Sequence, residues 1–296
     1  MEKIKRTFGF IFNHPLAKRH PVKAFYRFLL WQLQSSISSS KFIIKPFVAH
    51  LKFYARKGLA GATGNIYTGL HEFNDMGFLL HFLQPDDVFF DIGANVGSYT
   101  LLASGICQTT SVAVEPIKST FEILSKNIQL NNLSNNVILV NSGAGAIVGE
   151  LRFSANEDTT NHVIAVGEQG EGAISVTAIT VDSLLEKGSP ALIKIDVEGF
   201  ETEVLKGMSY TLDNTALKAI IIELNGSGLR YGFNEDAIHD MLLSKGFTSF
   251  SYNPFTRLLN ETPPFSSGNT IYCRDLSIIN ERLKNAKKIK LWGELI

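Results

Sequence analysis

The stretch VFFDIGANVGSYTLLA, residues 88–103, joins an apolar run, a loop with two glycines and a second apolar segment at helical spacing. Its first five residues predict a buried strand, and the order strand, loop, helix is the first unit of a parallel α/β sheet. Gly93 and Gly97 let the backbone approach a ligand closely because they carry no Cβ. The pattern therefore predicts a tight turn and a helix whose first N–H groups face a ligand beyond the end of the strand.

Strand-like and helix-like segments alternate along the rest of the chain. Apolar runs predict parallel strands at residues 88–92, 111–115, 137–140, 192–197 and 219–224. Amphipathic segments predict helices at residues 98–106, 117–131, 201–208 and 234–247. Two last strands, 249–252 and 270–274, have no helix between them and predict a terminal antiparallel hairpin. The fold expected is α/β, with a mostly parallel seven-stranded sheet and helices on both of its faces.

Residues 149–181 interrupt this alternation between the third and fourth strands. Short alternating segments there predict a β-excursion, with a polar loop at residues 155–161. Long polar excursions on α/β folds often cover a substrate. His162 lies in this excursion and is either a base delivered by a lid or an ordinary hydrogen-bonded side chain.

Charge is distributed unevenly along the 296 residues. The formal net charge is zero, but residues 1–57 hold 12 of the 28 Lys and Arg residues and one of the 28 acids. The acidic remainder is not the pattern of a nucleic-acid-binding protein, so we expect no nucleic-acid partner. Two cysteines, and no apolar run near the ~20 residues that span a bilayer, predict a cytoplasmic protein with reduced thiols.

Residues 1–57 form a basic helical N-terminal extension, which we separate from a main domain at residues 58–296. Four apolar side chains share one stripe of a predicted helix at residues 22–34, namely Val22, Phe25, Leu29 and Leu33. The Ser-rich residues 35–41 predict a linker, and residues 46–58 predict a second helix. The extension either lies on an anionic membrane, at its inner face, or packs on the main domain with its basic side chains in water.

The first loop favours a cationic ligand without phosphate. Its glycine spacing is neither that of dinucleotide-binding loops nor that of phosphate-binding loops, and no lysine follows it. Asp91 would repel a pyrophosphate and suits a cation, whereas Glu115 is placed to accept hydrogen bonds from ribose hydroxyls. S-adenosylmethionine has an adenine, a ribose, an ammonium and a sulfonium, so it fits this chemistry. Its adenine is expected near the end of the third strand, at Asn141, Ser142 and Gly143.

The reacting end is predicted at the tips of the fourth and fifth strands. Asp196 ends one strand, Glu198 lies in the following turn, and Glu223 lies on the neighbouring strand. Burial beside apolar residues could raise the pKa of a carboxylate there and make it a better base toward a hydroxyl. We expect Asp196 to act as the base or to orient the acceptor, with Glu198 and Glu223 as further candidates. The alternative for Asp196 is a structural acid that fixes the loop. The seven histidines show no metal-ligand spacing, so we predict no metal site.

Three segments, DIGANVGSYT, AVEP and above all KIDVEGFE at residues 194–201, resemble the FkbM family of S-adenosylmethionine-dependent methyltransferases. The resemblance covers residues 69–274. It implies a class I methyltransferase fold and, as the usual activity, O-methylation of sugars or natural products. It implies cofactor contacts at Asp91, Gly93, Asn95, Gly97 and Glu115, with the neighbours Ser98, Tyr99 and Pro116 included. It also implies that Glu72 closes over the cofactor and that residues 196–199 face a small-molecule or glycan acceptor.

Two other functions remain open at this point. A nicotinamide-dependent oxidoreductase would need a third glycine in the first loop, where Ser98 and Tyr99 follow Gly97. A non-catalytic module that binds a membrane or a partner would keep the cofactor pocket as a vestige, and the basic extension motivates that reading. Methylation of nitrogen instead of oxygen is only weakly disfavoured. The sequence predicts neither the acceptor nor the oligomeric state.

Overall fold

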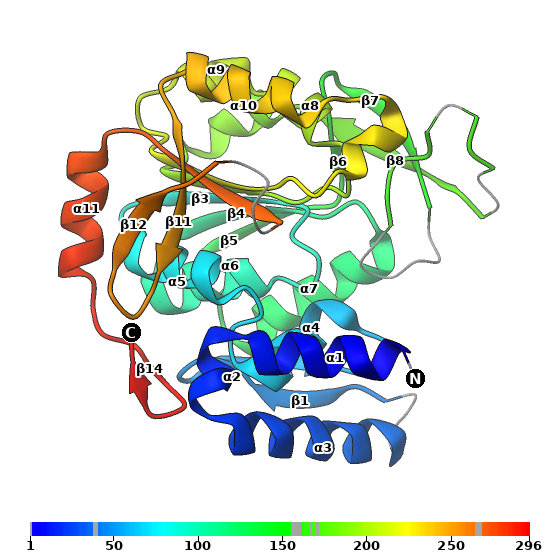
Figure 1. Cartoon of the computed structure of the whole chain (residues 1–296). Coiled ribbons are helices and arrows are strands. Elements are labelled where there is room, and N and C mark those ends of the chain that lie inside the picture. Colours follow the sequence, from blue (N-terminus) through cyan, green and yellow to red (C-terminus); the bar gives the residue numbers. More distant parts are fainter. Residues whose placement is uncertain (1, 38–40, 155–160, 166, 170–171, 264–267) are drawn as a thin grey trace.

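A central eight-stranded sheet organises the protein, as the computed structural model shows (Figure 1). The structure describes residues 2–37, 41–154, 161–165, 167–169, 172–263 and 268–296. The strands lie in the order β12-β11-β13-β10-β9-β3-β4-β5. Their bounds are β3 (Val88–Ile92), β4 (Thr110–Val114), β5 (Val137–Val140), β9 (Leu192–Ile195), β10 (Ala219–Glu223), β11 (Thr248–Asn253), β12 (Leu258–Glu261) and β13 (Asn269–Cys273).

The sheet is parallel from β10 to β5 and mixed at its other end. The pairs β10–β9, β9–β3, β3–β4 and β4–β5 are parallel, whereas β13 runs antiparallel to both β10 and β11. This confirms the predicted α/β class and the antiparallel terminal strand. The sheet has one strand more than the seven predicted. The additional strand, β12, is a short edge strand of sequence LLNE whose side chains are mostly exposed, so its apolar pattern is weak.

Helices cover both faces of the sheet, because successive residues of the central strands are apolar on both sides. Phe89 packs into the cluster on one face and Phe90 into the cluster on the other. The first face carries α5 (Phe73–Phe82), α6 (Ser98–Leu102) with the π-helix Ala103–Cys107, α7 (Lys118–Leu130) and α11 (Leu276–Asn285). The second face carries α8 (Glu201–Lys206), α9 (Ser209–Asp213) and α10 (Glu235–Ser244), with short 3-10 helices at Val181–Lys187 and Ser227–Tyr231.

The predicted β-excursion is a separate three-stranded sheet in the order β6-β8-β7. Its strands are β6 (Gly143–Ala144), β7 (Gly149–Phe153) and β8 (Ile174–Ile179). Phe153 also forms an isolated bridge with Val163. Residues 155–160 of the predicted polar loop lie outside the described residues. The excursion therefore joins the main sheet just after β5, beside the carboxyl ends of the strands.

The N-terminal extension is helical as far as residue 37, in α1 (Glu2–Asn13), α2 (Pro15–Arg19) and α3 (Pro21–Ile37). Helix α3 runs into the predicted linker, of which residues 38–40 lie outside the described part. The helix predicted at residues 46–58 is wrong. An antiparallel hairpin of β1 (Ile43–Pro46) and β2 (Lys52–Ala55) stands there instead.

The hairpin follows from buried and more exposed side chains that alternate along β2. The basic residues and the glycine at the end of the segment, which are typical of a helix C-terminus, obscure this alternation in the sequence. Phe53 and Ala55 are buried, whereas Lys52 is exposed. The outer edge of β2 is bonded by side chains of α7, since the amides of Lys52 and Tyr54 donate to Asn131 Oδ1 at 2.9 Å and Asn127 Oδ1 at 2.7 Å. A tertiary partner therefore decides the structure of this segment.

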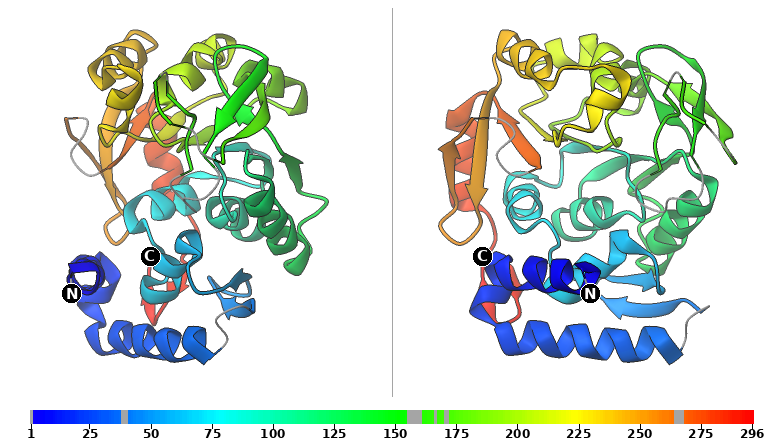
Figure 2. Two further views of the ribbon diagram at one scale, coloured as in Figure 1. Left: turned by 90° about the vertical axis from the view of Figure 1, so that its right-hand side faces the viewer. Right: turned by 45° about the vertical axis from the view of Figure 1, so that its right-hand side comes forward.

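The extension packs on the main domain at one end of the molecule (Figure 2). Ile11, Leu16 and Trp31 belong to the same hydrophobic cluster as Phe89 of the central sheet. Helix α4 (Ala60–Thr68) connects the two parts, and a C-terminal hairpin of β14 (Lys290–Leu291) and β15 (Glu294–Leu295) lies against α2. The domain boundary at residue 57 stays a prediction.

Candidate active site

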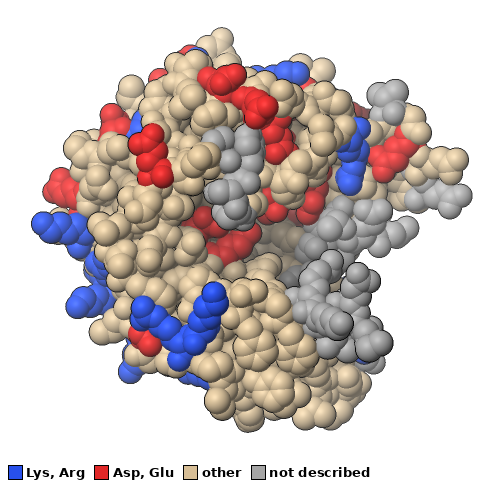
Figure 3. Space-filling view, in the orientation of Figure 1, with Lys and Arg blue, Asp and Glu red and all other residues tan. Residues whose placement is uncertain are grey.

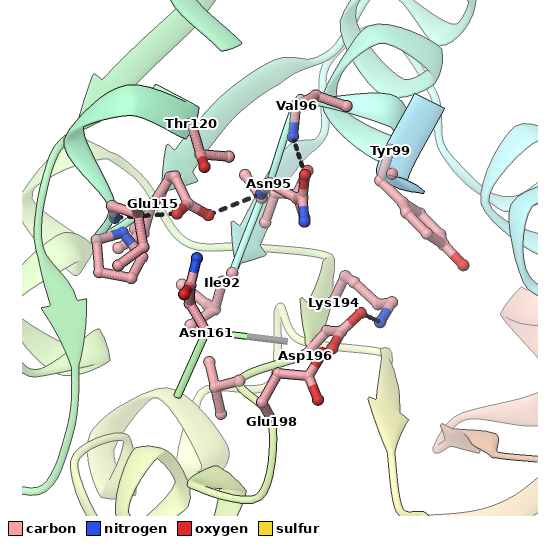
Figure 4. A pocket seen from close by; sticks show the side chains of 18 of the residues that line it. Ile92, Asn95, Val96, Tyr99, Glu115, Thr120, Asn161, Lys194, Asp196 and Glu198 are labelled. Atoms are coloured by element: carbon pink, nitrogen blue, oxygen red, sulfur yellow. Dashed lines mark hydrogen bonds and ion pairs between the residues drawn. The ribbon is translucent and has the colours of Figure 1, made fainter. Parts of the chain in front are cut away.

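A cavity of about 260 Å³ lies at the carboxyl ends of the central strands. The loop after β3, the residues after β4 and β9, and the last residue of β10 line it, and α4 and α5 contribute from the side. In Figure 4, Glu115 and Asn95 lie at one end of the cavity, and Asp196, Glu198 and Lys194 lie at the other. The cavity thus joins the two ends that the sequence assigns to the cofactor and to the reaction.

The loop between β3 and α6 is closed by its own hydrogen bonds. The five amides of residues 93–97 all donate within the protein, Gly93 and Ala94 to Val114 O, Asn95 to Glu115 Oε2, Val96 to Asn95 Oδ1 and Gly97 to Ala94 O. The loop itself therefore presents no unpaired amide to a ligand, and the prediction about the first N–H groups of the following helix α6 concerns other residues, of which the amide of Thr100 donates to Asp91. A phosphate-binding loop presents unpaired amides to its anion, and these amides are already paired.

Gly93 is required because two loops cross at van der Waals distance. Its φ is +82°, and a Cβ at this position would lie 1.9 Å from the carbonyl oxygen of Asp196. The loops after β3 and β9 therefore touch through backbone alone. Gly199, in the turn that carries Glu198, is constrained in the same way, because its Cβ would lie 2.6 Å from Ser227 O.

Glu115 is buried at the cavity wall, immediately after β4. Its two carboxylate oxygens accept hydrogen bonds from the amides of Asn95, at 2.9 Å, and Ile117, at 3.0 Å. Burial raises the pKa of Glu115 to about 7, although these two hydrogen bonds oppose the shift. Each carboxylate oxygen keeps a further lone pair, so the group can accept ribose hydroxyls from the cavity.

Asp91 uses part of its carboxylate to hold helix α6. Its Oδ2 accepts hydrogen bonds from the amide of Thr100 at 3.0 Å and from the hydroxyl of Thr100 at 2.5 Å. Burial raises the pKa of Asp91 to about 6, against the hydrogen bonds from Thr100. Asp91 is thus a structural acid in part, and the cavity beside it has a negative potential whenever the group is ionised.

Three carboxylates meet at the other end of the cavity. One oxygen each of Asp196, Glu198 and Glu223 lies within 4.8 Å of the others. The buried ammonium of Lys194 lies 3.1 Å from Asp196 Oδ2, so it supplies the cation that this cluster needs. The prediction that no metal binds here stays a prediction.

The cluster holds Asp196 ionised and Glu223 protonated. Burial alone would raise the pKa of Asp196, but the Lys194 ammonium and hydrogen bonds with Glu223 and Lys194 outweigh burial and lower it. Burial and the charge of Asp196 raise the pKa of Glu223, which therefore donates its proton toward Asp196. The sequence argument that burial raises the pKa of Asp196 is corrected by this pairing. Burial and the charge of Asp196 raise the pKa of Glu198 to about 7.

The predicted site residues mostly come together around this cavity. Those that line it are Glu72, Asp91, Gly93, Asn95, Ser98, Tyr99, Glu115, Pro116, Ser142, Gly143, Asp196, Glu198 and Glu223. Gly97 does not line it, because it caps α6 at a φ of +89° and packs against Leu124. Asn141 does not line it either, since its amide group donates to the carbonyls of Glu115 and Pro116 from behind. His162 is buried in the excursion, 2.9 Å from Glu168, outside the cavity lining.

Several residues of the site carried no clear signal in the sequence. Glu201 accepts the amides of Val197 and Gly199 at 3.1 and 3.2 Å, so it fixes the turn that presents Glu198. Its signal was the last acid of the KIDVEGFE segment. Lys194 lies within strand β9, a position that from the sequence alone favours a paired structural lysine. Asn65 of α4, Met76 of α5 and His71, in the turn between these two helices, also line the cavity.

A second cavity of about 620 Å³ adjoins the first and shares His71, Glu72 and Glu223 with it. Its walls come from α1, the start of α5 and the strands β11 and β13. Glu72 accepts the hydroxyl hydrogen of Tyr99 at 2.6 Å, and Asp75 accepts a hydrogen bond from Asn269 at 3.3 Å. Acidic side chains gather in the hollow at the centre of the face drawn in Figure 3. The shared residues make a contact point between the two cavities.

Comparisons with known proteins identify the family of this chain. The family description "Methyltransferase FkbM domain" matches residues 91–249. Hexuronic acid methyltransferase AglP of Haloferax volcanii is 31% identical over 50% of this chain, and Methyltransferase 1 of Beauveria bassiana is 30% identical over 42% of it. The matched region spans only 59% of the length of each of these two relatives. Methyltransferase sdnD of Sordaria araneosa is 25% identical over 56% of this chain and 75% of its own.

Proposed function

Because this chain belongs to the methyltransferase FkbM domain family, we propose that it is an S-adenosylmethionine-dependent methyltransferase. In this proposal it methylates a hydroxyl group of a sugar, a glycan or glycolipid, or a natural product. The observation that carries the proposal is the cavity between Glu115 and Asp196, whose loop amides are all paired and whose wall is acidic. Such a cavity suits a cationic nucleoside and opposes a phosphorylated one.

The residues present fit S-adenosylmethionine. Glu115 offers acceptors for ribose hydroxyls, and Asp91 and Glu72 give the middle of the cavity a negative potential that suits an ammonium group. Lys194, the one Lys or Arg among the described lining residues, is already paired with Asp196. When bound, this cofactor supplies a methyl group on a positively charged sulfur, already activated for transfer.

The protein's part in the reaction is to orient the acceptor and to receive its proton. We propose that Asp196 accepts the hydroxyl proton, because Lys194 keeps its carboxylate ionised and about a third of its side chain, 32%, is exposed. Glu223 donates a hydrogen bond that fixes the orientation of the Asp196 carboxylate. Glu198, with its pKa raised to about 7, is the alternative base.

The competing functions are less well supported. A nicotinamide dinucleotide carries a pyrophosphate, which would meet paired amides and a wall with six acidic side chains in this cavity. A non-catalytic module would not require the ion pair between Lys194 and Asp196. Removing these charges from water costs free energy, and the pair adds nothing to a surface that only binds a partner. Titration calorimetry separates these functions, since we expect heat with S-adenosylhomocysteine and none with NADH. The opposite result would remove the methyltransferase proposal.

Glu115→Gln should weaken binding of S-adenosylhomocysteine by about ten- to a hundredfold, because hydrogen bonds to an ionised group are worth about 1.5–3 kcal/mol. Protonation has a related effect, so affinity of the unchanged protein should fall as the pH falls through about 7, and the variant should lack that dependence. Calorimetry across this pH range measures both. Glu122→Gln on the exposed side of α7 is the matched control. Equal loss in the two variants would show that Glu115 has no role in the cavity.

We further propose that the acceptor occupies the second cavity and is uncharged. Glu72, Asp75 and Glu223 line that cavity, and its described lining residues include no Lys or Arg. A carboxylate or phosphate on the acceptor would therefore meet Glu72, and Asp75 whenever that buried group is ionised, with no Lys or Arg as a counter-charge. The relative from Haloferax volcanii is named for a hexuronic acid, and this chain is proposed to share the sugar but not the acidic group.

Matched sugars test the acceptor class. Methyl glucoside should be methylated at least about tenfold faster than methyl glucuronide, since an unpaired charge at a buried site costs well over 1.4 kcal/mol. Transfer of radioactive methyl groups to each sugar measures this ratio. Faster transfer to the glucuronide, in a protein that binds S-adenosylhomocysteine, would reject the uncharged acceptor and leave the methyltransferase proposal intact.

A further inference from the structure

Helix α3 presents its apolar stripe to solvent. Val22, Tyr26 and Leu33 are 81%, 62% and 64% exposed, and the same side of the helix carries further exposed apolar residues, Phe25, Leu29, Leu30 and Ile37. The side that packs on the protein carries the smaller or polar residues Ala24 and Ser35, with Trp31. A helix that only packs on a protein buries its apolar stripe, so this one has the reverse of the expected orientation.

The exposed stripe occupies one end of the molecule. In Figures 1 and 2, α3 forms the outer edge opposite α8, α9 and α10, and no other labelled element lies beyond it. The stripe extends over the whole helix, about 25 Å at 1.5 Å per residue. Among the described residues, no helix is long and apolar enough to cross a bilayer.

Basic side chains lie at one side of this end, where α2 and the C-terminal hairpin meet the start of α3. Lys18 of α2 and Lys23 of α3 are exposed, and Lys23 donates a hydrogen bond to Trp292 O at 3.2 Å in the C-terminal hairpin. Residues 284–290, from the end of α11 into the first strand of this hairpin, add more exposed lysines without an acid, at Lys284, Lys287, Lys288 and Lys290. A second copy of this chain would place these cations against one another, whereas an anionic lipid surface would neutralise them.

We propose that the outward side of α3, with these flanking lysines, docks on the surface of an anionic lipid bilayer. The apolar side chains would enter the boundary between headgroups and acyl chains, and the lysines would lie among the headgroups. Helix α1 packs on α3 through Phe8, which stacks near Phe25 and Phe28, and α1 also forms a wall of the second cavity. Docking would therefore bring that cavity close to the bilayer.

Vesicle flotation tests this face. The full-length protein should float with vesicles of three parts phosphatidylcholine to one part phosphatidylglycerol, and less with phosphatidylcholine alone or at high salt. The combined variant Val22→Ser, Tyr26→Ser, Leu33→Ser should lose about tenfold in binding to the anionic vesicles. The control Val148→Ser, Tyr210→Ser, Leu258→Ser removes the same residue types at exposed sites of the main domain and should bind as before.

The flotation result is independent of the methyltransferase proposal, because flotation needs neither cofactor nor acceptor. Equal binding by the two variants, or no flotation of the unchanged protein, would reject the membrane face. A dimer in analytical ultracentrifugation that dissociates only in the α3 variant would assign the stripe to a second copy and would also overturn the proposal. Unchanged circular dichroism of the α3 variant confirms that its fold is intact.

Discussion

Gly93→Ala should destabilise the protein by more than about 4 kcal/mol, which is exceptional for a single methyl group. The added Cβ would lie 1.9 Å from the carbonyl oxygen of Asp196, and neither backbone can move without distorting β3 or β9 at the centre of the sheet. The residue also has a φ of +82°, which costs an alanine about 1–2 kcal/mol by itself. Urea unfolding followed by circular dichroism measures the loss, and a very low soluble yield would be its extreme form.

Gly58→Ala separates the two contributions. Gly58 has a φ of +89°, nearly that of Gly93, but a Cβ there would have no atom within 4 Å. The control should therefore lose only about 1–2 kcal/mol. A similar loss in both variants would mean that the loops after β3 and β9 can separate, and the close crossing at the cavity would then have no structural role.

The central sheet was predictable because its strands are apolar on both faces and alternate with amphipathic helices. Phe89 and Phe90 enter hydrophobic clusters on opposite faces of the sheet, which explains the unbroken apolar run at the start of residues 88–103. The order of the strands places the ends of β3, β4, β9 and β10 side by side. Acids that follow those strands must therefore meet at one edge, and the sequence argument found most of them for that reason.

The sequence-based predictions are wrong, or lack a signal, where contacts with distant parts of the chain decide the local structure. Residues 46–58 were predicted as a helix, but two asparagines of α7 bond the edge of β2 and select a hairpin. Strand β12 has one neighbour and little burial, so it lacks a pattern. The pairing of the loop amides of residues 93–97 carries no signal in the sequence, and only the fold shows that Val114 and Glu115 accept from three of them.

Asp196→Asn should lower kcat by about a hundredfold or more, the contribution usual for a positioned general base. Asparagine keeps the shape and can still accept a hydrogen bond from Lys194, but it cannot receive a proton. Loss of the Asp196 charge should lower the pKa of Glu223, so that Glu223 ionises and neutralises Lys194 in its place. We therefore expect the variant to fold and to bind S-adenosylhomocysteine normally.

The pH profile of kcat at saturating cofactor distinguishes Asp196 from Glu198 as the base, because a base acts only when it is deprotonated. If Glu198 receives the proton, kcat should fall as the pH falls through about 7. If Asp196 receives it, kcat should persist below that pH, since Lys194 keeps the pKa of Asp196 below its usual range. Asp240→Asn, on an exposed position of α10, controls for the loss of an acid. Full turnover by Asp196→Asn would exclude Asp196, and an inflection near 7 in the unchanged protein would then assign the proton to Glu198.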